Sequence, residues 1–155
     1  MKVIKPPDSI DIIPNTKAVF LAGSIDMGNA INWQVTVTQA LADSPVTFLN
    51  PRRDDWDASW EQSTNNPQFV AQVNWELEAL EKAHYIAMYF APHSKAPITL
   101  LELGLFAQSK KLIVCCSKNF WRKGNVDVVC QRYDIPQVTN LENLIQAIKK
   151  ECVEI

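Results

Sequence analysis

The chain has 155 residues, of which 47% are hydrophobic and 21% charged. This composition is typical of one globular domain and excludes the disordered and fibrous classes. The formal net charge of −2 indicates neither a nucleic-acid polymer nor an anionic membrane as a partner. Because the opening residues lack a signal-peptide pattern and no apolar run is long enough to cross a membrane, we expect a soluble cytoplasmic protein.

The chain opens with a proline-containing stretch, residues 1–16, which we expect to be a lead-in to a single domain over residues 17–155. Short apolar runs in that domain predict strands, and helical spacing of apolar residues predicts helices between them. The expected strands are 17–24, 46–49, 85–91, 112–116 and a short one at 137–138; the expected helices are 30–42, one from Pro67 with Asn66 as N-cap, 98–110 and 140–150.

Strands that alternate with helices in this way indicate parallel crossover connections. We therefore expect an α/β fold, with a single doubly wound, mainly parallel five-stranded sheet of the flavodoxin-like or Rossmann-like type and helices on both faces. Ligands bind such sheets beyond the carboxyl ends of the strands. The candidate site is thereby limited to four segments: Gly23-Ser24, residues 50–57, residues 92–102 and the residues after Cys116.

Several kinds of chemistry are disfavoured by the motifs that the chain lacks. The turn at Gly23 and Ser24 matches neither G-x-G-x-x-G nor a P-loop, so it is either a turn that needs glycine or a place of close backbone approach to another type of ligand. The four cysteines form no C-x-x-C pair and there are only two histidines. We therefore expect no metal site and no metal or organic cofactor, and carboxylates remain as the candidate catalysts.

Glu102 has both a structural and a functional interpretation. Thr99 and Glu102 have the spacing of a capping box, in which Thr99 would be the helix N-cap. Thr139 and Glu142 have the same spacing before the last helix, and we interpret that pair as structural. Glu102 differs because leucines surround it at the ligand edge of the sheet, which predicts a partly buried carboxylate in the first helical turn, kept ionised by the helix dipole.

Glu76 borders the apolar stripe of the helix that begins at Pro67. A residue in that position usually packs its stem and extends its carboxylate to solvent. The alternative is a carboxylate that enters the cleft as an acid, a base or a binding group.

The polar segment that follows the second strand, residues 52–66, is expected to be a long loop. It carries Arg52, Asp54, Trp56, Asp57 and Trp60. An indole in such a loop can stack on a base, and the charged groups can bind a sugar or a phosphate. An ordinary mixed-charge surface loop has a similar composition.

Five segments follow one another on the expected elements: Phe20-Leu21-Ala22-Gly23-Ser24, Asn50-Pro51-Arg52-Arg53, Asn74-Trp75-Glu76-Leu77-Glu78, Leu100-Leu101-Glu102-Leu103-Gly104 and Gly124-Asn125-Val126-Asp127. Together they resemble the nucleoside 2-deoxyribosyltransferase family over most of the domain. The resemblance implies that Glu102 is the nucleophile and that Glu76 helps to hold the base. It also implies a homo-oligomer with shared sites, in which Asn125 or Asp127 reaches the sugar bound by a neighbouring subunit.

The resemblance also has departures. Ala96 stands where several transferases carry an acidic residue, and Gly23-Ser24 is similar to the related nucleotide N-glycoside hydrolases, which grip a 5′-phosphate. Base exchange, hydrolysis of a nucleoside or its 5′-monophosphate, and a non-catalytic nucleotide-binding module therefore remain open.

The first hypothesis is that Glu102 attacks C1′ of a 2′-deoxyribonucleoside through an oxocarbenium-like transition state, while Glu76 orients or protonates the leaving base. A second base or water would then release the sugar. The expected partners are a deoxynucleoside and a nucleobase. The residues expected to bind the substrate are Gly23, Ser24, Asp26, Asn50, Arg52, Asp54, Trp56, Asp57, Asn125 and Asp127.

Overall fold

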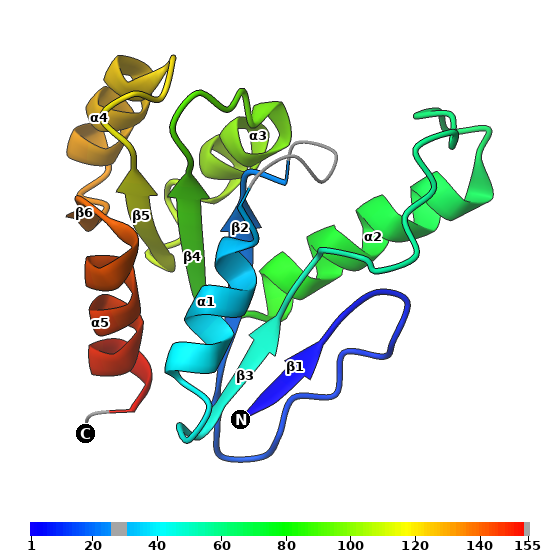
Figure 1. Ribbon diagram of the computed structural model, residues 1–155, viewed down its shortest axis with the longest axis horizontal. Helices are drawn as coiled ribbons and strands as arrows, with labels where there is room; N and C mark the ends of the chain where they lie inside the picture. Colours follow the sequence, from blue (N-terminus) through cyan, green and yellow to red (C-terminus); the bar gives the residue numbers. More distant parts are fainter. Residues whose placement is uncertain (26–30, 154–155) are drawn as a thin grey trace.

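The computed structural model describes residues 1–25 and 31–153, so the predicted site residue Asp26 lies outside the described residues. Strands and helices alternate along most of the chain (Figure 1). In chain order they are β1 (Lys2–Ile4), β2 (Lys17–Gly23), α1 (Trp33–Ala40), β3 (Val46–Leu49), α2 (Pro67–Lys82), β4 (Tyr85–Phe90), α3 (Pro97–Phe106), β5 (Leu112–Cys116), α4 (Lys123–Arg132), β6 (Gln137–Val138) and α5 (Leu141–Cys152).

All the strands belong to one parallel sheet in the order β1-β3-β2-β4-β5-β6. The α/β class and the doubly wound sheet are confirmed, but the sheet has six strands and not five. The additional strand is β1, which lies in the segment expected to be a lead-in. It pairs with β3 from Lys2 opposite Thr47 to Ile4 opposite Leu49.

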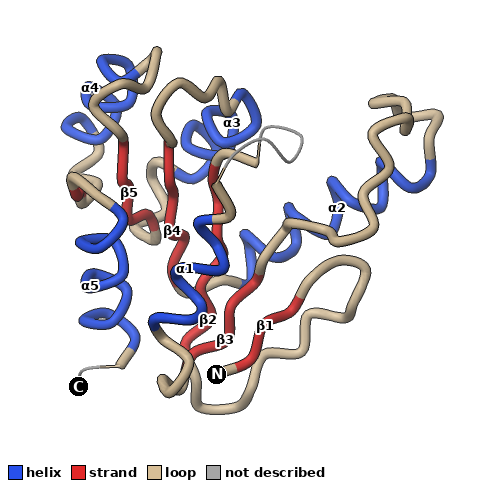
Figure 2. The backbone as a smooth tube through the Cα atoms, viewed as in Figure 1, coloured by secondary structure: helices blue, strands red, loops and turns tan. Residues whose placement is uncertain are grey.

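Two helical layers cover the two faces of the sheet (Figure 2). On one face α1 and α5 pack Trp33, Val37 and Leu144 against the strands. On the other face α2, α3 and α4 form the second core cluster, to which Leu80 and Leu103 belong. Because α2 and α3 share this second face, Glu76 and Glu102 are carried by helices of the same layer.

The point at which the strand order changes direction lies between β2 and β4. From β2 the chain leads to β3 on one side, and β4 and β5 follow on the other side. Strands β2 and β4 run in the same direction, and Gly23 lies opposite Tyr89 at their carboxyl ends. A crevice at such a switch point is the usual ligand site of a doubly wound sheet.

Only the inner part of α2 packs on the sheet. Its buried residues begin at Gln72, whereas the first turn, from Pro67, is exposed or half-buried. Figure 1 shows the outer end of this helix, together with the loop before it, projecting away from the body of the molecule. As predicted, α2 begins at Pro67 with Asn66 as N-cap, whose Oδ1 accepts hydrogen bonds from the amides of Gln68 and Phe69.

Other helix boundaries differ from the prediction. The helix expected over 30–42 is described only over Trp33–Ala40, and the one expected over 98–110 is Pro97–Phe106. Helix α4 was not predicted, because its sequence carries a glycine and a mixture of charged and apolar residues without a clear stripe. None of the described helices is long and apolar enough to cross a membrane.

Candidate functional site

Glu102 lies in the second turn of α3, and its side chain is almost completely buried, with 7% of the residue exposed. Burial, together with the nearby charge of Glu76, raises its pKa to about 8. The prediction that the helix dipole keeps this carboxylate ionised is therefore wrong. The residue is too far into the helix for the dipole to dominate, and desolvation favours the protonated form.

The capping-box interpretation of Thr99 is also wrong. The N-cap of α3 is Ala96, in the left-handed conformation with φ of 42°, and Pro97 is the first helical residue. Thr99 is a buried residue inside the first turn. Glu102 therefore has no role at the helix terminus that would explain a buried carboxyl group.

The second Thr-x-x-Glu segment, residues 139–142, serves as the comparison for Glu102. There the N-cap is Asn140 and not Thr139, since Oδ1 of Asn140 accepts a hydrogen bond of 2.8 Å from the amide of Asn143. Glu142 lies in the first turn of α5 and is exposed. The predicted difference in setting is thus confirmed: Glu142 is a surface residue, whereas Glu102 is buried.

Glu76 lies on the inner part of α2 and is half-buried. Its Oε1 accepts a hydrogen bond of 2.7 Å from Nε2 of Gln72, one helical turn earlier. The same nitrogen donates to the carbonyl of Pro51, at 3.1 Å, so this amide connects α2 to the chain after β3. Desolvation raises the pKa of Glu76, and the hydrogen bond from Gln72 opposes that rise.

The two carboxyl groups act on each other electrostatically, since the charge of Glu76 is one cause of the raised pKa of Glu102. Such a pair loses its protons in two coupled steps. The first ionisation opposes the second because two like charges in a poorly solvated place repel each other. Near neutral pH the raised pKa of about 8 therefore favours a proton on Glu102.

The turn after β2 is held by two buried hydroxyl groups. The Oγ atoms of Ser24 and Ser94 are 2.6 Å apart, and the residues are 1% and 4% exposed. Oγ of Ser94 donates to the carbonyl of Ala91 at 2.9 Å, and Oγ of Ser24 accepts from the amide of Ala91 at 3.2 Å. The hydroxyl of Ser24 therefore donates to Ser94, and its hydrogen is already engaged within the protein.

Gly23 is required by packing. A Cβ atom at this position would lie 2.6 Å from Cζ2 of Trp33 and 2.6 Å from the carbonyl oxygen of Tyr89. This packing contact explains the glycine without a ligand, and it differs from the predicted reason, a turn that needs glycine.

The turn after β3 is fixed by Asn50, which is 4% exposed. Its backbone amide donates to the carbonyl of Ile4, at 2.9 Å, and its Oδ1 accepts a hydrogen bond of 3.0 Å from the amide of Arg52. Asn50 and Arg52 thus lie at the carboxyl edge of the sheet, on the side where Gln72 contacts Pro51.

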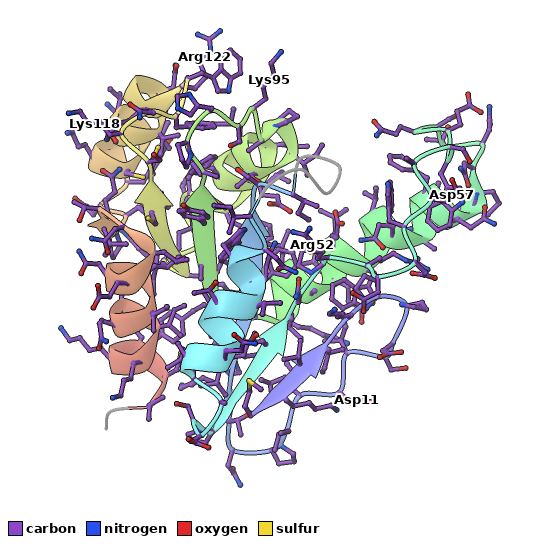
Figure 3. The ribbon with its side chains drawn as sticks, in the orientation of Figure 1. Asp11, Arg52, Asp57, Lys95, Lys118 and Arg122 are labelled. Carbon is purple, nitrogen blue, oxygen red and sulfur yellow. The ribbon has the colours of Figure 1, made fainter. Side chains whose placement is uncertain are left out.

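The rest of the polar loop extends to the outer end of α2, and Figure 3 shows Asp57 there, far from Arg52 at the base of the loop. Trp56 and Trp60 pack on each other with ring centroids 5.1 Å apart. Asp54 pairs with Lys5 at 2.8 Å. The carboxylate of Asp57 accepts hydrogen bonds from Ser59.

Asn125 and Asp127, the residues predicted to reach a neighbouring subunit, lie on α4. Asn125 is exposed and lines a surface hollow of about 280 Å³ together with Leu100 and Trp121. Asp127 is bound within its own chain, by an ion pair of 2.7 Å with Lys123 and a hydrogen bond from Gln137. Burial raises the pKa of Asp127, but the contacts with Lys123 and Gln137 lower it by more. The net result is a lowered pKa.

Two site residues were missed at the level of sequence. The position of Gln72, one turn before Glu76 on the stripe that should be apolar, was a signal that could have identified it. Ser94 carried no such signal, because its contact with Ser24 depends on the neighbouring ends of β2 and β4.

Other nucleophiles are poorly placed. Cys115 and Cys116 are buried in β5, and burial raises the pKa of each thiol to about 11. Within residues 1–25 and 31–153, no group of three or more His, Cys, Asp or Glu side chains is arranged to hold a metal ion.

The fold and the site define a class: a parallel α/β protein with one buried and one half-buried carboxyl group, Glu102 and Glu76, on helices of the same layer. Residues 16–120 match the protein family described as nucleoside 2-deoxyribosyltransferase like, and the chain belongs to this family. The matched region contains Glu76 and Glu102 and ends before Asn125 and Asp127.

Among solved structures, the chain is similar to a conserved protein from Enterococcus faecalis V583, with a TM-score of 0.63 and 8% sequence identity. The similarity covers 88% of this chain and 99% of the other, and at this identity it concerns the fold alone. No curated protein matches the sequence.

Proposed function

We propose that the protein is a nucleoside 2-deoxyribosyltransferase, which cleaves the N-glycosidic bond of a 2′-deoxyribonucleoside and transfers the sugar to another base. The observation that carries this proposal is a pair of carboxyl groups with raised pKa values, buried Glu102 and half-buried Glu76, on two helices of the same layer. Membership of the family supports a nucleoside as the ligand.

In the first step an oxygen of ionised Glu102 attacks C1′ and forms a glycosyl ester, while the bond from C1′ to the base nitrogen breaks. The electron pair of that bond remains on the base, and protonated Glu76 supplies the proton. Because Glu102 holds a proton in the resting protein, with a pKa of about 8, this step requires that the proton first moves from Glu102 to Glu76. The poorly solvated surroundings strengthen the attraction between Glu102 and the positive charge that develops at C1′.

In the second step a nitrogen of the acceptor base attacks C1′ and releases Glu102 as a carboxylate. The base nitrogen loses its proton to Glu76, which restores the starting state. If water is the acceptor, the same two residues release free deoxyribose. Both outcomes proceed with retention at C1′, because each involves two successive displacements.

The apolar outer face of α3 supports a second part of the proposal, that copies of the chain assemble around the site. Ile98, Leu101 and Leu105 are 57%, 59% and 58% exposed and lie on one side of the helix that carries Glu102. A second copy that covers this face would bring its own side chains close to the site. Neighbouring copies would then contribute to substrate binding.

The reaction is tested by incubating the protein with one deoxynucleoside and a different free base, and by separating the products by chromatography. A new deoxynucleoside is the expected product. Free base together with deoxyribose would instead indicate hydrolysis. If neither bond cleavage nor transfer occurs with any of the four common deoxynucleosides, the proposal is wrong.

The role of Glu102 is tested by the substitution Glu102→Ala, with Glu78→Gln as the control on exposed α2 surface. Loss of the nucleophile should lower the rate by roughly three or more powers of ten, whereas the control should retain the wild-type rate. A 2′-fluorinated analogue, in which electron withdrawal slows both steps, should leave a sugar attached to Glu102 that intact-protein and peptide mass spectrometry can locate.

A further inference from the structure

The loop before α2 and the outer end of that helix form an arm, residues 54–71, which projects from the body of the molecule (Figure 1). Its own side chains order the end of the arm. The rings of Trp56 and Trp60 meet edge to face, and Arg53, just before the arm, lies over the ring of Trp60 and pairs with Asp55. Trp56 nevertheless stays exposed. An ordered aromatic group that its own chain leaves uncovered is typical of a contact surface.

A second exposed apolar surface lies on α3 and on the residues just before α4. This α3–α4 face consists of Ile98, Leu101, Leu105 and Trp121, and its two parts meet at a hollow that Leu100 and Trp121 both line. Trp121 is held in place, because its Nε1 donates to the carbonyl of Lys95 at 3.0 Å and Arg122 stacks on its ring. The face thus presents fixed apolar groups on the helix that carries Glu102.

The arm is acidic. Residues 54–71 include four carboxylates and no lysine or arginine. Asp54 and Asp55 form ion pairs with Lys5 and Arg53, whereas no ion pair in the described part of the chain includes Asp57 or Glu61. Two exposed carboxylates therefore remain available beside the tryptophans.

The rim of the α3–α4 face is basic. Lys95, Lys118 and Arg122 are exposed there, and Glu102, the only acidic residue between positions 91 and 126, is buried. Figure 3 shows these three cations beyond the ends of β4 and β5, far from Asp57 of the arm. The arm and the face are complementary in charge, and both carry exposed apolar groups, but they lie apart within one chain.

We infer that the arm of each copy docks on the α3–α4 face of a second copy, in a symmetric dimer that exchanges the two arms. In a two-fold dimer the same two surfaces meet twice, so that one chain supplies both halves of each contact. Contact of the tryptophans with the face contributes affinity, and the acidic arm against the basic rim fixes the orientation. The inference rests on the proposed function, whose assembly it deepens by naming the segment that covers α3.

Two variants with reversed charges test this contact. Asp57→Lys with Glu61→Lys reverses the arm, and Lys95→Glu with Arg122→Glu reverses the rim. Each variant alone should dimerise about 10- to 100-fold more weakly than wild type, because like charges then meet in both contacts. A mixture of the two should restore the dimer, since each reversed arm then meets a reversed face and each native arm a native face. Analytical ultracentrifugation measures the dissociation constants.

The matched control is Glu142→Lys with Lys150→Glu, on the exposed surface of α5, and it should dimerise as wild type does. A chain with all four arm and rim substitutions should also form a dimer, because its reversed arms meet reversed faces. Circular dichroism verifies that each variant is folded. The inference is wrong if wild type is a monomer, if the two variants dimerise as wild type does, or if neither the mixture nor the combined chain restores the dimer.

These measurements involve no substrate, so they separate the inference from the proposed reaction. If mixing restores the dimer but no deoxynucleoside is cleaved, the docking of the arm stands and the proposed reaction is wrong. If the wild-type protein exchanges bases but the charge reversals leave its assembly unchanged, the reaction stands and the docking is wrong.

Discussion

Burial raises the pKa of Glu102 on α3, and the nearby charge of half-buried Glu76 on α2 raises it further. The coupling depends on the fold, because the two helices pack on the same face of the sheet. Both effects favour the protonated form of Glu102. This relationship gives the first two predictions.

Removal of the charge of Glu76 should lower the pKa of Glu102. In Glu76→Gln the like charge is absent while the packing volume is kept, so Glu102 should titrate below the value of about 8 that it has beside Glu76. The pKa can be followed by NMR titration of the Glu102 side-chain carboxyl carbon. The exposed residue Glu78, which pairs with Lys82, provides the control Glu78→Gln. An unchanged pKa in Glu76→Gln would show that burial alone sets the titration.

The raised pKa of Glu102 should also make the folded state less stable as the pH rises. The folded pKa of about 8 exceeds the ordinary 4.5, so the folded state holds a proton that the unfolded chain releases. The contribution to stability is fully present below pH 4.5 and is lost as the pH rises to about 8.

Glu102→Gln removes this dependence. It should match wild type near pH 4 and exceed its free energy of unfolding by roughly 2–4 kcal/mol near pH 8. Urea denaturation at the two pH values measures the difference, with Glu142→Gln on the surface of α5 as the control. A gain of equal size at both pH values would contradict the assignment, because it would not arise from ionisation.

The exposed face of α3 leads to a prediction about assembly. A charge at Leu101, which is 59% exposed, should prevent a second copy from covering this face. Leu101→Asp should therefore shift the protein to a smaller species in analytical ultracentrifugation, with a parallel loss of activity. Val35→Asp, on helix α1 of the opposite face, should leave the wild-type assembly intact. If Leu101→Asp sediments as wild type, α3 is not the interface.

Local signals explain why much of the fold could be predicted. The strands at Val46–Leu49 and Leu112–Cys116 were predicted with the observed limits, because continuous apolar runs are buried on both faces of a parallel sheet. The start of α2 was also correct, because Asn66 and Pro67 are adjacent start signals. In contrast, β1 has only three residues and becomes a strand through its pairing with β3, which its own sequence does not indicate.

The site was less predictable for a related reason. Residue type and setting correctly identified Glu102 as a buried carboxyl group, but its protonation state depends on desolvation and on Glu76, a residue from another helix. The helix start was misplaced because Ala96 adopts a left-handed conformation that favours glycine or asparagine and is rarely expected of alanine. Among the described residues Nη1 of Arg52 is buried without a hydrogen-bond partner, which cannot be deduced from sequence, since Arg53 next to it pairs with Asp55.

The last prediction concerns Gly23. A methyl group there would lie 2.6 Å from the carbonyl oxygen of Tyr89 and 2.6 Å from the ring of Trp33, so β2 or α1 must shift to admit it. Gly23→Ala should lower the free energy of unfolding by about 1–3 kcal/mol. Gly104, inside α3, has no atom within 4 Å of a Cβ placed there. Gly104→Ala should raise stability by up to about 1 kcal/mol through helix propensity.

Each of the two variants thus adds one methyl group, but the expected changes in the free energy of unfolding have opposite signs. Denaturant unfolding of both variants measures these changes. The displacement in Gly23→Ala also reaches the adjacent hydroxyl pair of Ser24 and Ser94, which connects the ends of β2 and β4. Activity should therefore fall in this variant even at temperatures where it remains folded. A Gly23→Ala protein as stable as Gly104→Ala would mean that Trp33 can move aside, and the packing explanation of this glycine would then be wrong.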